Sequence, residues 1–128
     1  MPHVIHVLNG PNLNRLGKRE PEIYGRTTLA EVEEMCRAAA DPDMIVFRQT
    51  NWEGQLVDWV HEAIDAEASG MVINPAGLTF RSIPLLDSLK MFPAPIIELH
   101  ISNIHRRDPI YHHSLISPVA TAVIAGLG

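Results

Sequence analysis

The stretch Val4-Ile-His-Val-Leu-Asn-Gly-Pro-Asn12 begins as a β-branched, apolar run and is stopped abruptly at Asn9-Gly10-Pro11. A short apolar run that ends in turn residues predicts a buried strand. Four later runs have the same character, and they are Met44 to Phe47, Met71 to Ile73, Ile96 to Leu99 and Val119 to Ala125. The chain therefore predicts a sheet of five short strands.

Amphipathic segments separate these runs. Thr28 and Glu31 have the spacing of a capping box, and an apolar stripe follows at helical spacing, formed by Leu29, Val32, Cys36 and Ala39. A second stripe comprises Leu56, Val57, Val60, Ala63 and Ile64, and Ser82 to Met91 predicts a short third helix. Strands that alternate with helices indicate an α/β fold whose parallel sheet is covered on both faces. We expect Cys36, on the apolar side of its helix, to be buried as a small hydrophobic residue.

The composition is that of an ordinary globular protein. The 128 residues are 46% hydrophobic and 20% charged, which suits one domain over residues 1–128. The formal net charge is −5 and the Lys and Arg residues are dispersed, which excludes the basic patch of a nucleic-acid-binding protein. We identify no secretory signal and no apolar run of about 20 residues that could span a bilayer, and so expect a cytoplasmic protein.

Polar residues follow four of the predicted strands where each strand ends. These are Asn9 to Asn12, Gln49 to Asn51, Asn74, and His100 to Asn103. Each Asn alone could serve only a turn, because Asn tolerates left-handed backbone. In open parallel sheets, however, ligands bind beyond the carboxyl ends of the strands. The recurrence of polar residues at this edge favours a polar ligand site.

His100 directly follows a strand, and Glu98 lies two residues earlier on the same face. A carboxylate behind a histidine can orient the ring and favour its protonated form, which suits a general acid. The alternative is a strand-end histidine held only by the backbone. Ile101 and Ser102 then offer N–H groups and a hydroxyl suited to a substrate carboxylate.

The segment from Asn14 to Arg26 predicts a long polar loop, and Gly17 and Gly25 bracket Arg19 and Tyr24 within it. Long loops with their own pattern are often lids. A phenol is ordinarily a weak acid, so a tyrosine base needs a close cation, which Arg19 or Arg15 could supply. The alternative is a surface tyrosine packed on its own loop.

Other chemistries fit less well. The histidines at 105, 112 and 113 lack a zinc-ligand pattern, neither Lys18 nor Lys90 is placed as a buried Schiff-base lysine, and no Gly-rich phosphate motif follows the first strand. Ser82 and Ser114 lie in no nucleophile elbow. Acid–base chemistry without a metal or cofactor is what remains.

The chain resembles the type II 3-dehydroquinate dehydratases in an ordered series of motifs. These are Val7-Leu-Asn-Gly-Pro-Asn-Leu-Asn14, Gly17-x-Arg-Glu-Pro-x-Ile-Tyr-Gly25, Gln49-Thr-Asn-x-Glu-Gly54, Asn74-Pro-Ala-Gly-Leu-Thr79, Glu98-Leu-His-Ile-Ser-Asn103, His112-His-Ser114 and Pro118-Val-Ala-Thr121. The resemblance implies a flavodoxin-like three-layer sandwich with a five-stranded parallel sheet. It also implies a homo-oligomer, typically a dodecamer built from trimers.

The resemblance further implies roles in the dehydration of a cyclic hydroxy-keto acid. Tyr24 would be the base, favoured as tyrosinate by Arg19, and Asn12 would place a water that stabilises an enolate. His100, oriented by Glu98, would protonate the leaving hydroxyl. The resemblance assigns the remaining contacts with the substrate to Asn74, Gly77, Ile101 and Ser102, and it implies that Asp87 reaches a neighbouring subunit's site.

Three departures from the family pattern stand out. Phe80 and Tyr111 occupy positions where the family usually has His and Arg, which hold the ring hydroxyls remote from the bond that breaks. Arg81, Arg106 or Arg107 could compensate. The chain also stops at Gly128, where the family normally continues into a last helix, so one sheet face could be exposed or covered by a neighbouring subunit. Three hypotheses follow. The first is dehydration of 3-dehydroquinate. The second is the same elimination on an analogue altered at its glycol end, which is the end with the remote ring hydroxyls, such as an amino or less hydroxylated analogue; the third is a catalytically inactive homologue.

Overall fold

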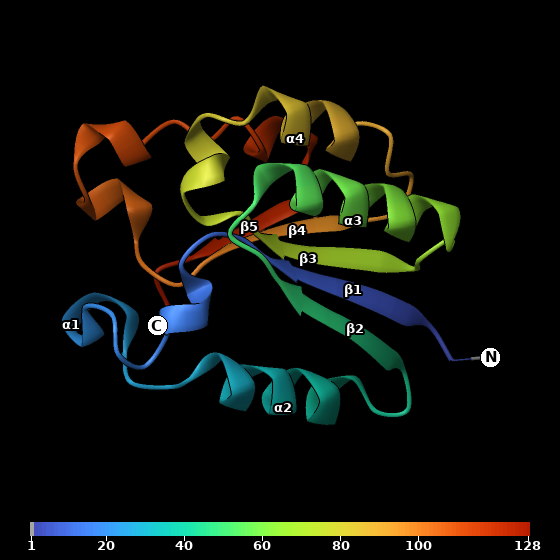
Figure 1. Cartoon of the computed structure of the whole chain (residues 1–128), viewed down its shortest axis with the longest axis horizontal. Helices are drawn as coiled ribbons and strands as arrows, with labels where there is room; N and C mark the ends of the chain where they lie inside the picture. Colours follow the sequence, from blue (N-terminus) through green and yellow to red (C-terminus); the bar gives the residue numbers. More distant parts are fainter. Residues whose placement is uncertain (1) are drawn as a thin grey trace.

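The protein is built around a parallel five-stranded sheet in the order β2-β1-β3-β4-β5. The computed structural model describes residues 2–128, and its strands are β1 (Val4–Asn9), β2 (Met44–Gln49), β3 (Gly70–Asn74), β4 (Ile96–His100) and β5 (Ala122–Ala125). Figure 1 shows that α3 and α4 cover one face of this sheet and that α2 lies against the other. This is the flavodoxin-like α/β sandwich that the sequence predicts.

The main core lies between the sheet and the pair α3 (Glu53–Asp65) and α4 (Ile83–Leu89). Leu8 of β1 and Ile73 of β3 are fully buried in it, as are Leu56 of α3 and Leu85 of α4. Burying a side chain of this size stabilises a fold by about 1.5–3 kcal/mol. The predicted apolar stripe of α3 is therefore confirmed as its sheet-facing side.

The second helix layer is thinner. The predicted capping box is present at the start of α2 (Leu29–Ala40), where Thr28 and Glu31 exchange hydrogen bonds, yet no residue of α2 is fully buried. Cys36 is only partly buried, so the prediction of a buried cysteine was wrong. The cause is that α2 packs beside β2 at one side of the sheet and leaves much of that face uncovered.

The uncovered part of this sheet face carries apolar side chains. Ile5, Val72 and Ile97 lie on neighbouring strands and line a shallow groove there. On the edge strand β5, Ile124 lies on the same face as Ile97 and is exposed. Within this chain the sheet is thus covered fully on one face only, so the prediction of a sheet covered on both faces was wrong for the described residues.

One predicted loop and one predicted strand need correction. The segment predicted as a polar loop from Asn14 to Arg26 contains a 3-10 turn (Leu13–Arg15) and the single helical turn α1 (Pro21–Tyr24), because Pro21 is suited to a first helical position. The last strand is shorter than predicted, since a 3-10 turn occupies Ser117–Val119 and β5 begins only at Ala122.

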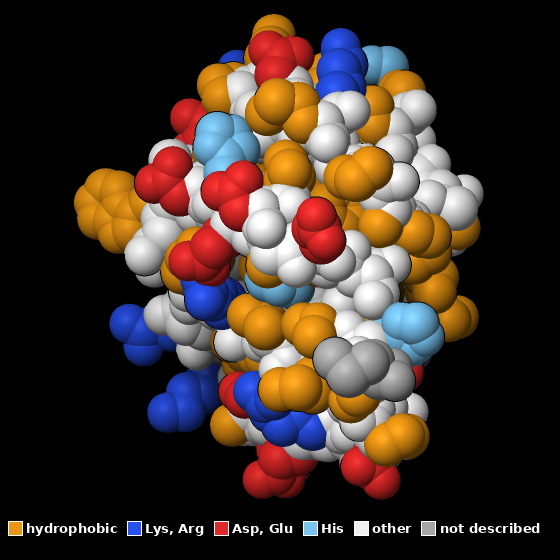
Figure 2. All heavy atoms as spheres, turned by 90° about the vertical axis from the view of Figure 1, so that its right-hand side faces the viewer, with side chains coloured by type: hydrophobic (Ala, Val, Ile, Leu, Met, Phe, Trp, Pro, Cys, Tyr) orange, Lys and Arg blue, Asp and Glu red, His pale blue; other side chains and the backbone are white. Residues whose placement is uncertain are grey.

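One end of the sheet, where the chain begins, faces the viewer in Figure 2, and acidic side chains are spread over this surface with hydrophobic ones between them. Among residues 2–128, no helix has both the length and the apolar character needed to cross a membrane.

Candidate active site

A pocket opens at the carboxyl end of the sheet, where the polar strand ends meet. All the residues predicted for the site line this pocket except Glu98 and Asp87. The lining residues that the sequence singled out are Asn12, Arg19, Tyr24, Asn74, Gly77, Phe80, His100, Ile101, Ser102 and Tyr111. The turns after β1, β3 and β4 thus meet the α1 segment around one cavity.

One wall of the pocket depends on close contact between two turns. The N–H of Gly10 donates to the carbonyl of Asn74 at 2.8 Å, and a Cβ at Gly10 would lie 2.4 Å from the Pro75 carbonyl oxygen. Asn12 is left-handed, with φ 72°, and its N–H donates to Oδ1 of Asn51 at 2.9 Å. Only glycine permits this approach at position 10, and the approach brings Asn12 and Asn74 to the same pocket.

Tyr24 is buried beside two guanidinium groups. Arg19 lies 4.6 Å and Arg107 lies 5.7 Å from the centroid of the Tyr24 ring. Arg107 also lies 4.0 Å from the centroid of the Tyr111 ring. Both guanidinium groups therefore lie against the Tyr24 ring in the pocket. From the sequence, either Arg19 or Arg15 was considered as the cation for this tyrosine, and Arg15 does not line the pocket. Arg107 was considered only as one of three arginines that could compensate at the far end of the site.

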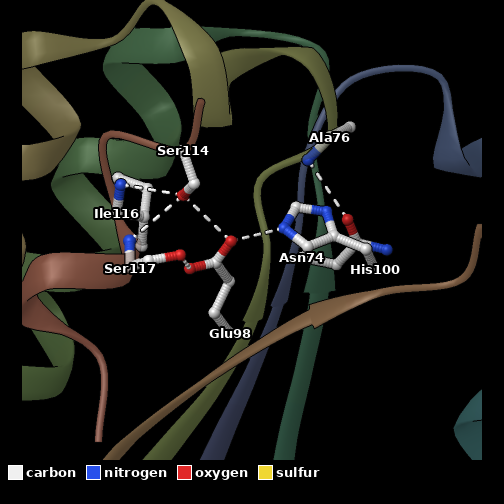
Figure 3. Close-up of polar contacts among 7 residues, drawn as sticks. All are labelled: Asn74, Ala76, Glu98, His100, Ser114, Ile116 and Ser117. Atoms are coloured by element: carbon white, nitrogen blue, oxygen red, sulfur yellow. Dashed lines mark hydrogen bonds and ion pairs between the residues drawn. The ribbon is translucent and has the colours of Figure 1, made fainter. Parts of the chain in front are cut away.

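His100 and Glu98 form a buried pair behind the pocket (Figure 3). Nε2 of His100 lies 2.5 Å from Oε2 of Glu98, and the two side chains are 4% and 0% exposed. Burial alone would raise the pKa of Glu98. Hydrogen bonds from His100 and Ser117, the charge of His100 and a hydrogen bond from Ser114 outweigh burial and hold this pKa below its ordinary value. Glu98 is therefore kept as a carboxylate that can orient the ring.

From the sequence, Ser114 was named only within the motif His112-His-Ser114 and as a serine outside any nucleophile elbow, and Ser117 was not named, yet both serines contact Glu98. Ser114 Oγ donates to Oε2 of Glu98 at 3.0 Å, and Ser117 Oγ donates to Oε1 at 2.6 Å. Both come from the segment before β5, 16 and 19 residues after Glu98 in the chain. Their role depends on tertiary packing, which spacing along the chain does not reveal.

The far wall of the pocket is aromatic. The rings of Phe80 and His100 stack with centroids 6.2 Å apart, and Phe80 meets Tyr111 edge-on at 5.4 Å. Phe80 offers no hydrogen-bonding group and Tyr111 offers one hydroxyl. Of the three arginines considered as compensation, Arg107 lines the pocket and Arg81 and Arg106 do not.

Asp87 lies apart from this pocket. Its carboxylate is on an exposed side of α4 and pairs with Lys90 at 3.9 Å. Residues 2–128 contain no group of three acidic, His or Cys side chains positioned to hold a metal ion.

Comparison with known proteins places this fold and site in one class. The family model for class II dehydroquinase matches residues 3–128. A 3-dehydroquinate dehydratase of Corynebacterium pseudotuberculosis is 56% identical over 128 residues, which cover 97% of this chain and 87% of that protein. Another, from Bartonella bacilliformis, is 54% identical over 130 residues, covering 100% of this chain and 82% of that one.

Solved structures agree. The type II dehydroquinase of Propionibacterium acnes superimposes with a TM-score of 0.95 at 43% identity, covering 100% of this chain and 89% of that one. A 3-dehydroquinate dehydratase-like protein of Bifidobacterium longum superimposes with a TM-score of 0.70 at 27% identity, covering 98% and 85%. The chain belongs to the class II dehydroquinase family, whose named members are hydro-lyases.

Proposed function

We propose that this protein dehydrates 3-dehydroquinate to 3-dehydroshikimate and water. The observation that carries the proposal is that Tyr24, flanked by Arg19, and His100, backed by Glu98, line one pocket. The names of the similar proteins from Corynebacterium pseudotuberculosis and Bartonella bacilliformis support the choice of substrate.

The reaction begins with Tyr24 as base. Its phenolate takes a proton from the carbon next to the ring ketone, and the electron pair moves to the ketone oxygen to form an enolate. Asn12 places a water that donates to this oxygen. A base and an oxyanion donor in a partly enclosed pocket are the arrangement that lowers such a barrier.

The second step uses His100 as acid. The enolate returns its electron pair, a carbon–carbon double bond forms, and the hydroxyl on the next carbon leaves with the proton of His100 as water. Tyr24 then releases to solvent the proton that it took from carbon, and His100 takes up a proton from solvent, so both groups return to their starting states. Glu98 orients the ring throughout through its contact with Nε2.

The remaining pocket residues hold the substrate. We assign its carboxylate to Ile101 and Ser102 at the end of β4, and ring contacts to Asn74 and Gly77. Phe80 and Tyr111 face the end of the ring remote from the bond that breaks.

A second candidate is the same elimination on an analogue altered at that remote end. The aromatic wall of Phe80 and Tyr111 favours it, because a site with fewer hydrogen-bonding groups discriminates less for ring hydroxyls. The family membership and the acid–base pair apply equally to both candidates.

We also propose that the protein is a homo-oligomer, a dodecamer built from trimers, in which Asp87 reaches the site of a neighbouring subunit. The exposed position of Asp87 on α4, away from its own pocket, is compatible with this role. Sedimentation of the purified protein measures the assembly directly. The cytoplasmic location stays a prediction from the sequence.

The decisive experiment mixes the purified protein with 3-dehydroquinate and follows the absorbance of the enone that dehydration forms. We expect turnover by the parent protein, and Tyr24→Phe and His100→Ala to lower kcat by about 10²–10⁴-fold each, the range for loss of a general base or acid. Conversion of only an analogue altered at the glycol end would favour the second candidate. A folded parent protein that is inert on every such compound would contradict both.

A further inference from the structure

The carboxylate of Glu98 is enclosed by hydrogen-bond donors from two directions (Figure 3). His100 and Ser114 both approach Oε2, at 2.5 and 3.0 Å, and Ser117 approaches Oε1 at 2.6 Å. Glu98 itself is 0% exposed, so no solvent reaches it. A buried carboxylate without such donors takes up a proton instead of remaining charged.

Within the described residues, Glu98 forms its single ion pair with His100. The other ionisable groups of the site, which are Arg19, Tyr24, Arg107 and Tyr111, line the pocket that His100 faces. On the side of the carboxylate away from the pocket, the groups that contact it are the two hydroxyls of Ser114 and Ser117. The charge of Glu98 therefore depends on uncharged donors there.

The two hydroxyls are held in place by a rigid turn. Ser114 Oγ accepts hydrogen bonds from the N–H groups of Ile116 and Ser117, at 3.0 and 3.1 Å, which directs its own proton toward Glu98. Ile116 is 0% exposed and belongs to the main core, and the N–H of Leu115 donates to the Thr79 carbonyl at 2.9 Å. The turn cannot withdraw from the carboxylate without removing Ile116 from the core.

We propose that Ser114 and Ser117 are positioning residues of the elimination, which hold the buried Glu98 as a carboxylate fixed against His100. They act through Glu98 and His100 and touch no substrate. The inference rests on the proposed function for its kinetic consequence, whereas its claim about Glu98 concerns the protein alone. A protonated Glu98 would no longer stabilise the positive charge that His100 needs as an acid.

The test compares Ser117→Ala and Ser114→Ala with the parent protein in two measurements. The first is kcat against pH, whose acid side falls as the base and Glu98 take up protons. The second is the titration of ¹³C-labelled glutamate carboxyl groups by NMR, with the Glu98 signal assigned from its loss in Glu98→Gln. We expect kcat to decrease on the acid side in Ser117→Ala, and the Glu98 midpoint to rise by about one pH unit, the effect of losing one hydrogen bond to a charge.

Three further variants separate positioning from packing. Ser117→Thr retains the hydroxyl and should keep the parent pH profile. Ser117→Cys has nearly the parent shape but a weaker donor, so it tests the proposal even where the alanine variant fails to fold. Ser88→Ala removes another buried hydroxyl, which donates to the Leu85 carbonyl at 2.8 Å, and should leave the titration of Glu98 unchanged.

The two failures are distinguishable. No turnover of 3-dehydroquinate by the parent protein would contradict the proposed function, and the NMR titration would still decide the role of the serines. A Glu98 midpoint in folded Ser117→Ala or Ser117→Cys equal to that of the parent would overturn the inference, whatever the kinetics.

Discussion

Phe80 stacks on His100, with ring centroids 6.2 Å apart and ring planes 26° from parallel. The proposed acid of the reaction therefore has a carboxylate on one side and an apolar ring on another. This ring occupies the end of the pocket where the family resemblance implies a histidine.

Phe80→His should strengthen binding of 3-dehydroquinate. A new imidazole can hydrogen-bond a ring hydroxyl, and one such bond corresponds to a fall in KM of about 2–10-fold. We expect kcat to change little, because Tyr24 and His100 are untouched. Steady-state kinetics measures both, and Phe80→Leu is the control that removes the ring without adding a polar group. A KM equal to that of the parent would show that the far wall makes no contact with ring hydroxyls.

Arg107→Met should lower kcat by about 10-fold or more, because the proposed base Tyr24 loses one of the two guanidinium groups beside its ring. Methionine keeps an apolar side chain against Tyr111. Arg107→Lys should recover part of the loss, since the charge remains while the planar contact with the rings does not. The matched control is Arg106→Met, next in the chain and outside the pocket lining. Equal losses in the two methionine variants would argue against a specific role for Arg107.

Protonation of His6 should limit stability in acid. Burial, with a smaller contribution from the charge of Arg48, lowers the pKa of His6 from 6.5, and its Nδ1 has no hydrogen-bond partner. As pH falls through 6.5 the unfolded chain binds a proton that the folded protein does not. The free energy of unfolding therefore decreases below pH 6.5 and levels off beneath the folded pKa.

His6→Leu should remove this part of the pH dependence. Urea unfolding between pH 4 and 8, a span of about two units on either side of an ordinary histidine pKa, measures it. The control is His61→Leu, at an exposed position of α3. The same acid slope in His6→Leu and the parent would contradict the prediction.

Gly10→Ala should destabilise the fold by about 1–3 kcal/mol, the usual cost of forcing atoms into a packed site. Its Cβ would lie 2.4 Å from the Pro75 carbonyl oxygen, and both groups are backbone that cannot rotate away. Gly54→Ala in α3 meets nothing within 4 Å and should instead stabilise by about 0.5–1 kcal/mol. Thermal unfolding of the two variants tests the contrast in sign.

Much of this fold could be predicted because its signals are local. The apolar run of β1 and the capping box of Thr28 and Glu31 depend only on neighbours in the chain. The degree of burial of Cys36 could not be predicted, because it depends on how much of the sheet its helix covers. The α1 turn was missed because its four residues make a single turn, which is too short to show a helical repeat in the sequence.

The same difference between local signals and tertiary packing decides which parts of the site could be predicted. The carboxyl-end rule located Asn12, Asn74 and His100 at one edge, because that rule follows from parallel strands alone. The contacts of Ser114 and Ser117 with Glu98 could not be predicted, since the two serines reach Glu98 only through tertiary packing of the segment before β5. The roles of the pocket residues remain predictions until the variants are measured.

The burial of Ile116 has a consequence for how this protein tolerates change. The turn that carries both serines is anchored in the same core that joins the sheet to α3 and α4. We therefore expect a substitution that loosens the packing of Ile116 to lower the melting temperature and to raise the pKa of Glu98 together.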